Sequence, residues 1–155
     1  MKEGIIMSKL VELDATLRLY EQNFRNLHWN AKGNDFNDSH KSITTEYYEM
    51  ISADVDKVAE MEAIMGIDPL NFTEAADFIV KSEKKYITIQ SDKHYTRAEI
   101  IEIANTMLLD ICAELAAAIE EISNPLDAGV RAELENLLYA YTLQARYINK
   151  RRMEE

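Results

Sequence analysis

The sequence predicts an all-α protein: a bundle of four long helices, with a short extra helix in the connection between the second and the third. Two observations lead to this prediction. Only 4 Gly and 2 Pro interrupt the 155 residues, and apolar side chains recur every three or four positions over long stretches. With 47% apolar residues, the chain is long enough for one core, so we expect a single domain over residues 1–155.

The first long helix is expected over residues 8–31 and the second over residues 37–66. Gly33 separates them, and Asn37 or Asp38 would cap the second helix. The spacing of the apolar residues gives each helix one buried face. In the second helix this apolar stripe consists of Ile43, Tyr47, Met50, Val58, Met61 and Met65.

A shorter amphipathic helix follows between Pro69 and Ser91, with Thr73 as its expected cap. Thr96 and Glu99 have the spacing of a capping box, which predicts that the third long helix starts there and ends near residue 123. The last helix is expected over residues 126–151. Two long helices, a crossover with a short helix, and two further long helices have the order of a ferritin-like bundle.

The charge balance excludes some function classes. With 28 acidic and 17 basic residues, the formal net charge is −11, which repels nucleic acid and anionic lipid, so DNA binding is not expected. The lone Cys112 cannot form a disulfide within the chain, and the N-terminus lacks the pattern of a secretory leader. No apolar run approaches the ~18 residues of a membrane span. We therefore expect a soluble cytoplasmic protein.

Two histidines and two carboxylates are candidate metal ligands. His28 lies near the end of the first helix and His40 near the start of the second, while Asp56 and Glu60 are one turn apart. Imidazole and carboxylate together suit Fe(II). At ~100° per residue, Asp56 and Glu60 lie nearly opposite the apolar stripe that contains Val58, so a metal bound there needs a second subunit. A helix-dipole role for His28 and a solvated acidic face are the alternative interpretations.

The usual di-iron site inside a four-helix bundle is excluded. That site needs a Glu-x-x-His motif on each of two helices. The residues three positions before His28, His40 and His94 are Arg25, Asn37 and Ser91.

The His28-Trp29-Asn30-x-Lys32-Gly33-x-x-Phe36-x-x-x-His40 run, with the later Asp56-x-x-x-Glu60 and Gly66-Ile67-x-Pro69, closely resembles Dps, the DNA-binding protein from starved cells, a mini-ferritin. The resemblance implies a dodecameric shell that oxidises Fe(II), with peroxide or oxygen as oxidant, and stores ferric iron. It implies that His28 and His40 bind iron from one subunit and that Asp56 and Glu60 bind it from the neighbour. Trp29 would trap radicals or transfer electrons.

Two departures from the family pattern leave alternatives open. Thr44 stands where the family has an Asp, and one extra residue separates His40 from Asp56. A π-bulge near residues 47–48 would absorb that residue. Alternatively, an insertion at residues 37–39 would place Lys41 where the ligand His belongs.

Replacement ligands for the missing carboxylate are also conceivable. They are Glu46, Glu49 and Asp54, and a buried Asp54 would need a polar partner. The alternative function is a non-catalytic shell or assembly protein of the same fold with a degenerate metal site.

Overall fold

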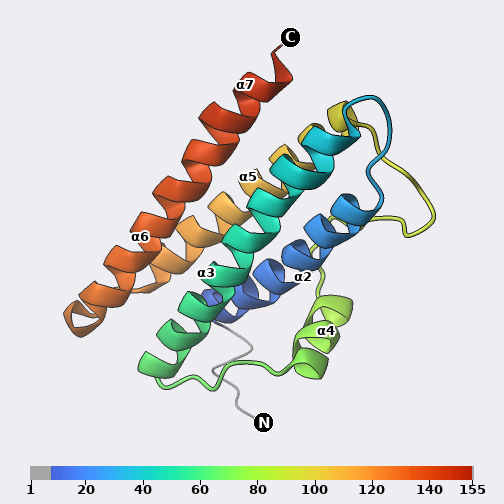
Figure 1. Cartoon of the computed structure of the whole chain (residues 1–155). Helices are drawn as coiled ribbons and strands as arrows, with labels where there is room; N and C mark the ends of the chain where they lie inside the picture. The colour runs from blue at the N-terminus through green and yellow to red at the C-terminus, as the bar shows by residue number, and fades with distance from the viewer. Residues whose placement is uncertain (1–7, 155) are drawn as a thin grey trace.

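Four long helices lie side by side around one hydrophobic core in the computed structural model, which describes residues 8–154 (Figure 1). This arrangement confirms the predicted all-α bundle. The helices are α2 (Lys9–Trp29), η1 (Asp38–Ile43, a π-helix), α3 (Thr44–Ile64), α4 (Phe72–Lys81), α5 (Arg97–Glu121), η2 (Pro125–Asp127), α6 (Ala128–Leu143), η3 (Gln144–Ile148, a second π-helix) and α7 (Asn149–Met153). In residues 8–154 no helix is both long and apolar enough to cross a membrane.

Capping residues determine where two of the helices begin. The Thr96 side chain accepts from the Glu99 amide at 3.3 Å and Glu99 accepts from the Thr96 amide at 3.1 Å, which confirms the predicted capping box of α5. The prediction of Thr73 as the cap of the short helix is wrong. Asn71 caps α4 through an equivalent box with Glu74, so Thr73 lies inside the first turn.

The start of the second long helix is wound as a π-helix. The Thr44 amide bonds to the Ser39 carbonyl, five residues back. The Thr44 hydroxyl donates to the same carbonyl at 2.7 Å, and the Thr45 hydroxyl donates to the His40 carbonyl at 3.0 Å. The π-turn therefore lies at η1 and not near residues 47–48 as predicted. His40, and not Lys41, packs against His28, which contradicts the alternative that places Lys41 where the ligand His belongs.

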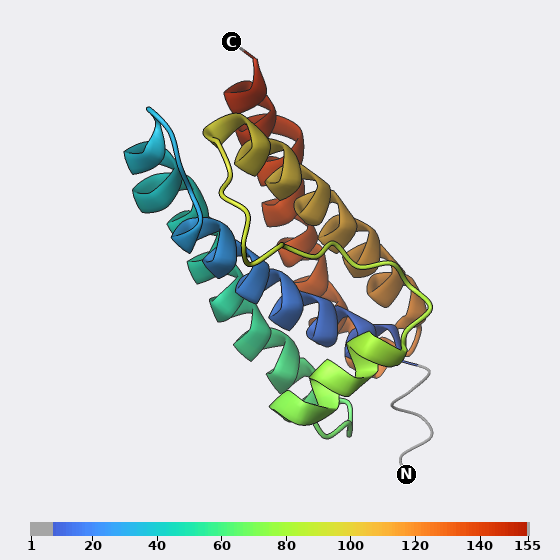
Figure 2. The ribbon, with the colours of Figure 1, turned by 90° about the vertical axis from the view of Figure 1, so that its right-hand side faces the viewer.

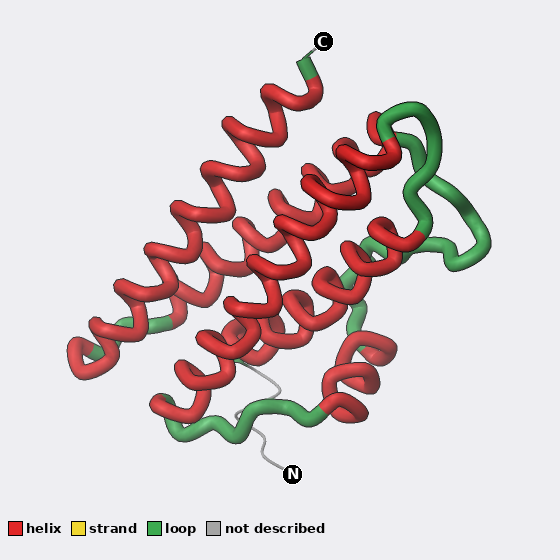
Figure 3. The backbone as a smooth tube through the Cα atoms, in the orientation of Figure 1, coloured by secondary structure: helices red, strands yellow, loops and turns green. Residues whose placement is uncertain are grey.

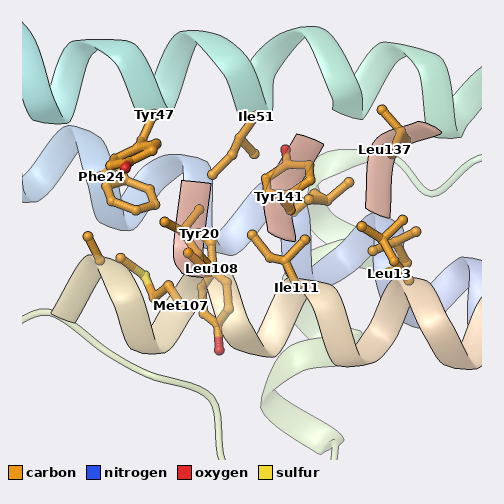
Figure 4. Close-up of a cluster of buried hydrophobic side chains, with 14 of the residues drawn as sticks. Leu13, Tyr20, Phe24, Tyr47, Ile51, Met107, Leu108, Ile111, Leu137 and Tyr141 are labelled. Atoms are coloured by element: carbon orange, nitrogen blue, oxygen red, sulfur yellow. The ribbon is translucent and has the colours of Figure 1, made fainter. Parts of the chain in front are cut away.

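The core is built from the inner faces of all four long helices. In Figure 4 the ring of Phe24 from α2 lies against that of Tyr47 from α3, with ring centroids 5.2 Å apart, and Tyr141 from α6 lies further along the same core. On α3 the apolar stripe is buried or half-buried, whereas Asp56 and Glu60 are exposed. The prediction that these two carboxylates face away from the bundle core is confirmed.

The α4–α5 connection runs along the outside of the bundle to the start of α5 (Figure 2). Lys84 ties it to α5 through ion pairs with Asp110, at 2.7 Å, and with Glu114. At its far end Tyr95 bonds to the loop that follows α2, donating to the Asn30 carbonyl at 2.8 Å and accepting from the Lys32 amide at 2.8 Å. Figure 3 shows the loop after α2 beside the last part of the α4–α5 connection, at one end of the bundle. These contacts hold the loop after α2 in place.

Candidate metal centre

His28 and His40 lie face to face at the junction of α2 and η1. Their ring centroids are 3.7 Å apart and the ring planes differ by 13°. Phe36 stacks on the other side of His40 at 4.9 Å, and Tyr48 contacts His28 edge-on at 5.4 Å. Gly33, with φ +101°, provides the backbone conformation that turns the chain back between the two histidines. The structure thus brings together, within one chain, the two histidines that the resemblance to Dps assigns to one subunit's part of the site.

The hydrogen bonds of His40 leave one ring nitrogen available. Its Nδ1 lies 2.7 Å from the His28 carbonyl oxygen. A carbonyl only accepts, so Nδ1 carries a proton, and Nε2 is the ring nitrogen that remains for another partner. His40 thus presents Nε2 as a metal ligand.

The ring of His28 is also held through its Nδ1, in this case by a threonine side chain. Nδ1 of His28 lies 3.0 Å from Oγ1 of Thr44. The Thr44 hydroxyl proton is already donated to the Ser39 carbonyl, so Oγ1 accepts from Nδ1–H of His28. Burial lowers the pKa of His28. This shift favours the neutral imidazole with a free Nε2, which is the form that binds metals.

Aromatic side chains beside the histidines reach solvent. Trp29 follows His28 at the end of α2 and is 59% exposed, and Phe36 is also exposed. Large exposed apolar side chains that gather at one place are typical of surfaces that contact another protein. The histidine pair therefore lies next to an apolar part of the surface.

The two carboxylates predicted as ligands lie elsewhere on the same chain. Asp56 and Glu60 share a face of α3 with Thr45, within about 60° of arc, but Asp56 is about 16 Å further along the helix. Among residues 8–154 no group of three or more His, Cys, Asp or Glu side chains is close enough to hold a metal. A single chain thus brings His28 and His40 together and leaves Asp56 and Glu60 apart from them.

Two of the three conceivable replacement ligands are engaged by other groups. Glu46 forms an ion pair with Arg152 at 3.1 Å. Asp54 is buried and accepts a hydrogen bond from the Tyr141 hydroxyl at 2.7 Å, which provides the partner that its burial requires. Burial raises the pKa of Asp54. Glu49 is exposed on the outer face of α3.

Sequence reasoning missed the roles of Tyr48 and of the two threonines that precede it. The Tyr48 ring contacts His28 edge-on. The guanidinium carbon of Arg25 lies over the same ring, 4.4 Å from its centroid. The adjacent Thr44 and Thr45 were the available signal, because threonine hydroxyls in helices bond back to carbonyls and distort the helix. Here those bonds stabilise the π-turn that places His40 against His28.

The fold of this chain matches solved structures, although no family model and no curated protein matches the sequence. Antigen TpF1 from Treponema pallidum is 17% identical with a TM-score of 0.82, covering 100% of this chain and 96% of that one. Dps from Staphylococcus aureus is 20% identical with a TM-score of 0.80, covering 99% and 97%. Dps from Listeria innocua, in a structure soaked with cobalt, is 18% identical with a TM-score of 0.79, covering 100% and 97%. The chain has the fold of Dps proteins over its whole length.

Proposed function

We propose that this protein is a Dps-like mini-ferritin that binds Fe(II) between subunits, oxidises it and stores ferric iron inside a shell. The observation that supports this most directly is the stacked pair of histidines, each with Nε2 free for a metal. The fold shared with Dps proteins supports the same function. We further propose a homo-oligomer, of twelve subunits by resemblance to the family, located in the cytoplasm.

The position of the carboxylates explains why the site would need two copies. In a two-fold symmetric pair, each contact across the interface occurs twice. If a residue of the first copy contacts a second residue of the other copy, the same two residues also meet with the copies exchanged. If the axis passes α3 about midway between Thr45 and Asp56, Asp56 and Glu60 of one copy reach the histidines of the other. The same operation builds a second, equivalent site. Trp29 and Phe36, exposed in the single chain, would then be covered.

Fe(II) is the substrate at this site, and the protein supplies ligands and an open position for the oxidant. Two neutral imidazoles and two carboxylates give a mixed nitrogen and oxygen ligand set, which suits iron. In the overall reaction two Fe(II) ions, bound at two sites or in succession at one, give up one electron each, and with two protons these two electrons reduce one hydrogen peroxide to two waters. Removal of both peroxide and free Fe(II) would protect the cell from radical chemistry. Trp29, adjacent to His28, would supply or accept single electrons.

The test is anaerobic titration of the purified assembly with Fe(II), followed by peroxide with absorbance readout. We expect saturable binding and rapid oxidation, and loss of both in Asp56→Asn and Glu60→Gln. Glu135→Gln, which removes an exposed carboxylate of α6, is the matched control and should behave as wild type.

A second candidate function follows from Thr44, whose hydroxyl oxygen is already held by the His28 ring and the Ser39 carbonyl. The protein could be a shell that kept the fold and lost the chemistry. An assembly that elutes as a large particle, yet neither binds nor oxidises Fe(II), would establish this second function and refute the first.

A further inference from the structure

We infer that each site holds one iron ion and not two, and that Thr44 is a positioning residue for His28. This inference rests on the proposed function and concerns how many ions bind and how tightly. It follows from the number of free donor atoms and from the hydrogen bonds around the two imidazoles.

The available ligands are sufficient for one metal ion. Di-iron bundle sites use four carboxylates and two histidines for two metals. Here the inter-subunit site would provide His28 and His40 from one copy, and Asp56 and Glu60 from the other. Four protein ligands plus an open position satisfy one iron, whereas two irons would have to share these four side chains, two fewer than the di-iron bundle site provides.

The nearby carboxylates that could complete a second metal position are paired with other groups. At the start of η1, Asp38 pairs with Arg97 at 2.8 Å. On α2, Glu21 pairs with Arg25 at 3.3 Å. Glu46 and Asp54 are engaged as described above, which leaves the exposed Glu49 as the carboxylate of α3 to be tested.

Thr44 lies at the ligand position but its oxygen is already in use. The side chain is fully buried, and Oγ1 is held between the His28 ring, at 3.0 Å, and the Ser39 carbonyl, at 2.7 Å. This chain of bonds fixes the proton on Nδ1 and the orientation of the His28 ring. Partners of this kind, which hold the far nitrogen of a metal-binding histidine, typically contribute 10–100-fold to metal affinity. Thr44 therefore acts through His28 and does not touch the metal.

The experiment is anaerobic titration of the full assembly with Co(II), read by its visible absorption, and with Fe(II) at one equivalent followed by oxidation and electron paramagnetic resonance. We expect one Co(II) per subunit and the resonance of isolated high-spin Fe(III), because a coupled ferric pair would be silent. Thr44→Val should weaken Co(II) affinity about 10–100-fold at unchanged stoichiometry. Thr44→Ser should restore the affinity, and Thr44→Asp should raise the stoichiometry to two.

The matched control is Thr106→Val. The Thr106 hydroxyl also bonds back to a helix carbonyl, that of Glu102 at 3.1 Å, but it is exposed on α5. Its loss should leave Co(II) binding unchanged. Glu49→Gln should likewise leave the stoichiometry at one.

Several outcomes would overturn the inference. Two Co(II) per wild-type subunit would refute the one-ion site, and a drop from two to one in Glu49→Gln would identify Glu49 as the additional ligand. Unchanged affinity in Thr44→Val would refute the positioning role. If no metal binds at all, the proposed function itself fails, which is a different result from two metals binding.

Discussion

Glu62→Gln is predicted to remove a pH-dependent loss of stability that a buried pair of carboxyl groups imposes. Glu62 on α3 and Asp14 on α2 are both fully buried. Arg18 binds Asp14 through two bonds of 2.7 and 3.2 Å, whereas neither Glu62 oxygen has a hydrogen-bonding partner that can donate to it. Burial, together with a hydrogen bond to Asp14 and its charge, raises the pKa of Glu62 far above its usual range. Glu62 therefore keeps its proton and donates it to Asp14.

The sign of the effect follows from proton counting. At neutral pH the folded protein retains the Glu62 proton, while the unfolded chain, with an ordinary Glu pKa of about 4.3, has lost it. The folded state binds more protons, so the free energy of unfolding falls as the pH rises. One proton gives a slope of at most about 1.4 kcal/mol per pH unit, or up to about 3 kcal/mol between pH 6 and pH 8. In Glu62→Gln, the new side-chain amide would donate to Asp14 without releasing a proton.

The assay is urea unfolding, followed by circular dichroism at pH 6, 7 and 8 and at one protein concentration at which the assembly state is the same. The free energy of unfolding of wild type should fall with rising pH. In Glu62→Gln this fall should be smaller, by up to about 1.4 kcal/mol per pH unit. Glu133→Gln, an exposed carboxylate on α6, is the control and should match wild type. Parallel pH curves for wild type and Glu62→Gln would show that Glu62 is ionised in the folded state, and would refute the reasoning.

Three further predictions concern the core, the aromatic residue at the site and the surface charge. Tyr141→Phe should lower the free energy of unfolding by about 1–3 kcal/mol in urea, because it leaves the buried Asp54 without its 2.7 Å partner; an unchanged value would mean that Asp54 finds another. Trp29→Phe should leave Fe(II) stoichiometry unchanged but reduce the protein-radical resonance after peroxide. In that reaction one electron from Fe(II), one electron and one proton from the indole, and one proton from the buffer reduce peroxide to two waters. An undiminished radical signal would place the radical on another residue. The assembly should not retard duplex DNA in a gel at low salt, because the net charge of −11 repels phosphate, and a clear shift would contradict this.

The sequence was sufficient for the fold because local signals agree with the tertiary arrangement. Apolar periodicity located the long helices, and the Thr96–Glu99 box gave the start of α5. The cap of the short helix was misplaced because Asn71 and Thr73 are both good caps, and only the reciprocal bond from Glu74 decides between them.

The site was predicted less completely, because part of it depends on contacts between distant residues. The outward direction of Asp56 and Glu60 follows from helical spacing, whereas the grouping of His28 with His40 came from the resemblance to Dps. The location of the π-turn follows from neither, since it depends on the threonine hydroxyl bonds at η1. The burial of Glu62 likewise depends on Asp14, which is 48 positions earlier in the chain and on another helix.

The central claim is that the metal lies between two copies, and mixed assemblies test it most directly. One chain carries His28→Ala and His40→Ala, and the other carries Asp56→Asn and Glu60→Gln. Each alone should bind no Fe(II). In a two-fold interface, random pairing of the two chains makes half of the pairs mixed, and each mixed pair contains one complete site. The account therefore predicts that about a quarter of the wild-type binding capacity returns on co-assembly. No return of binding in a well-formed mixed assembly would contradict a shared site.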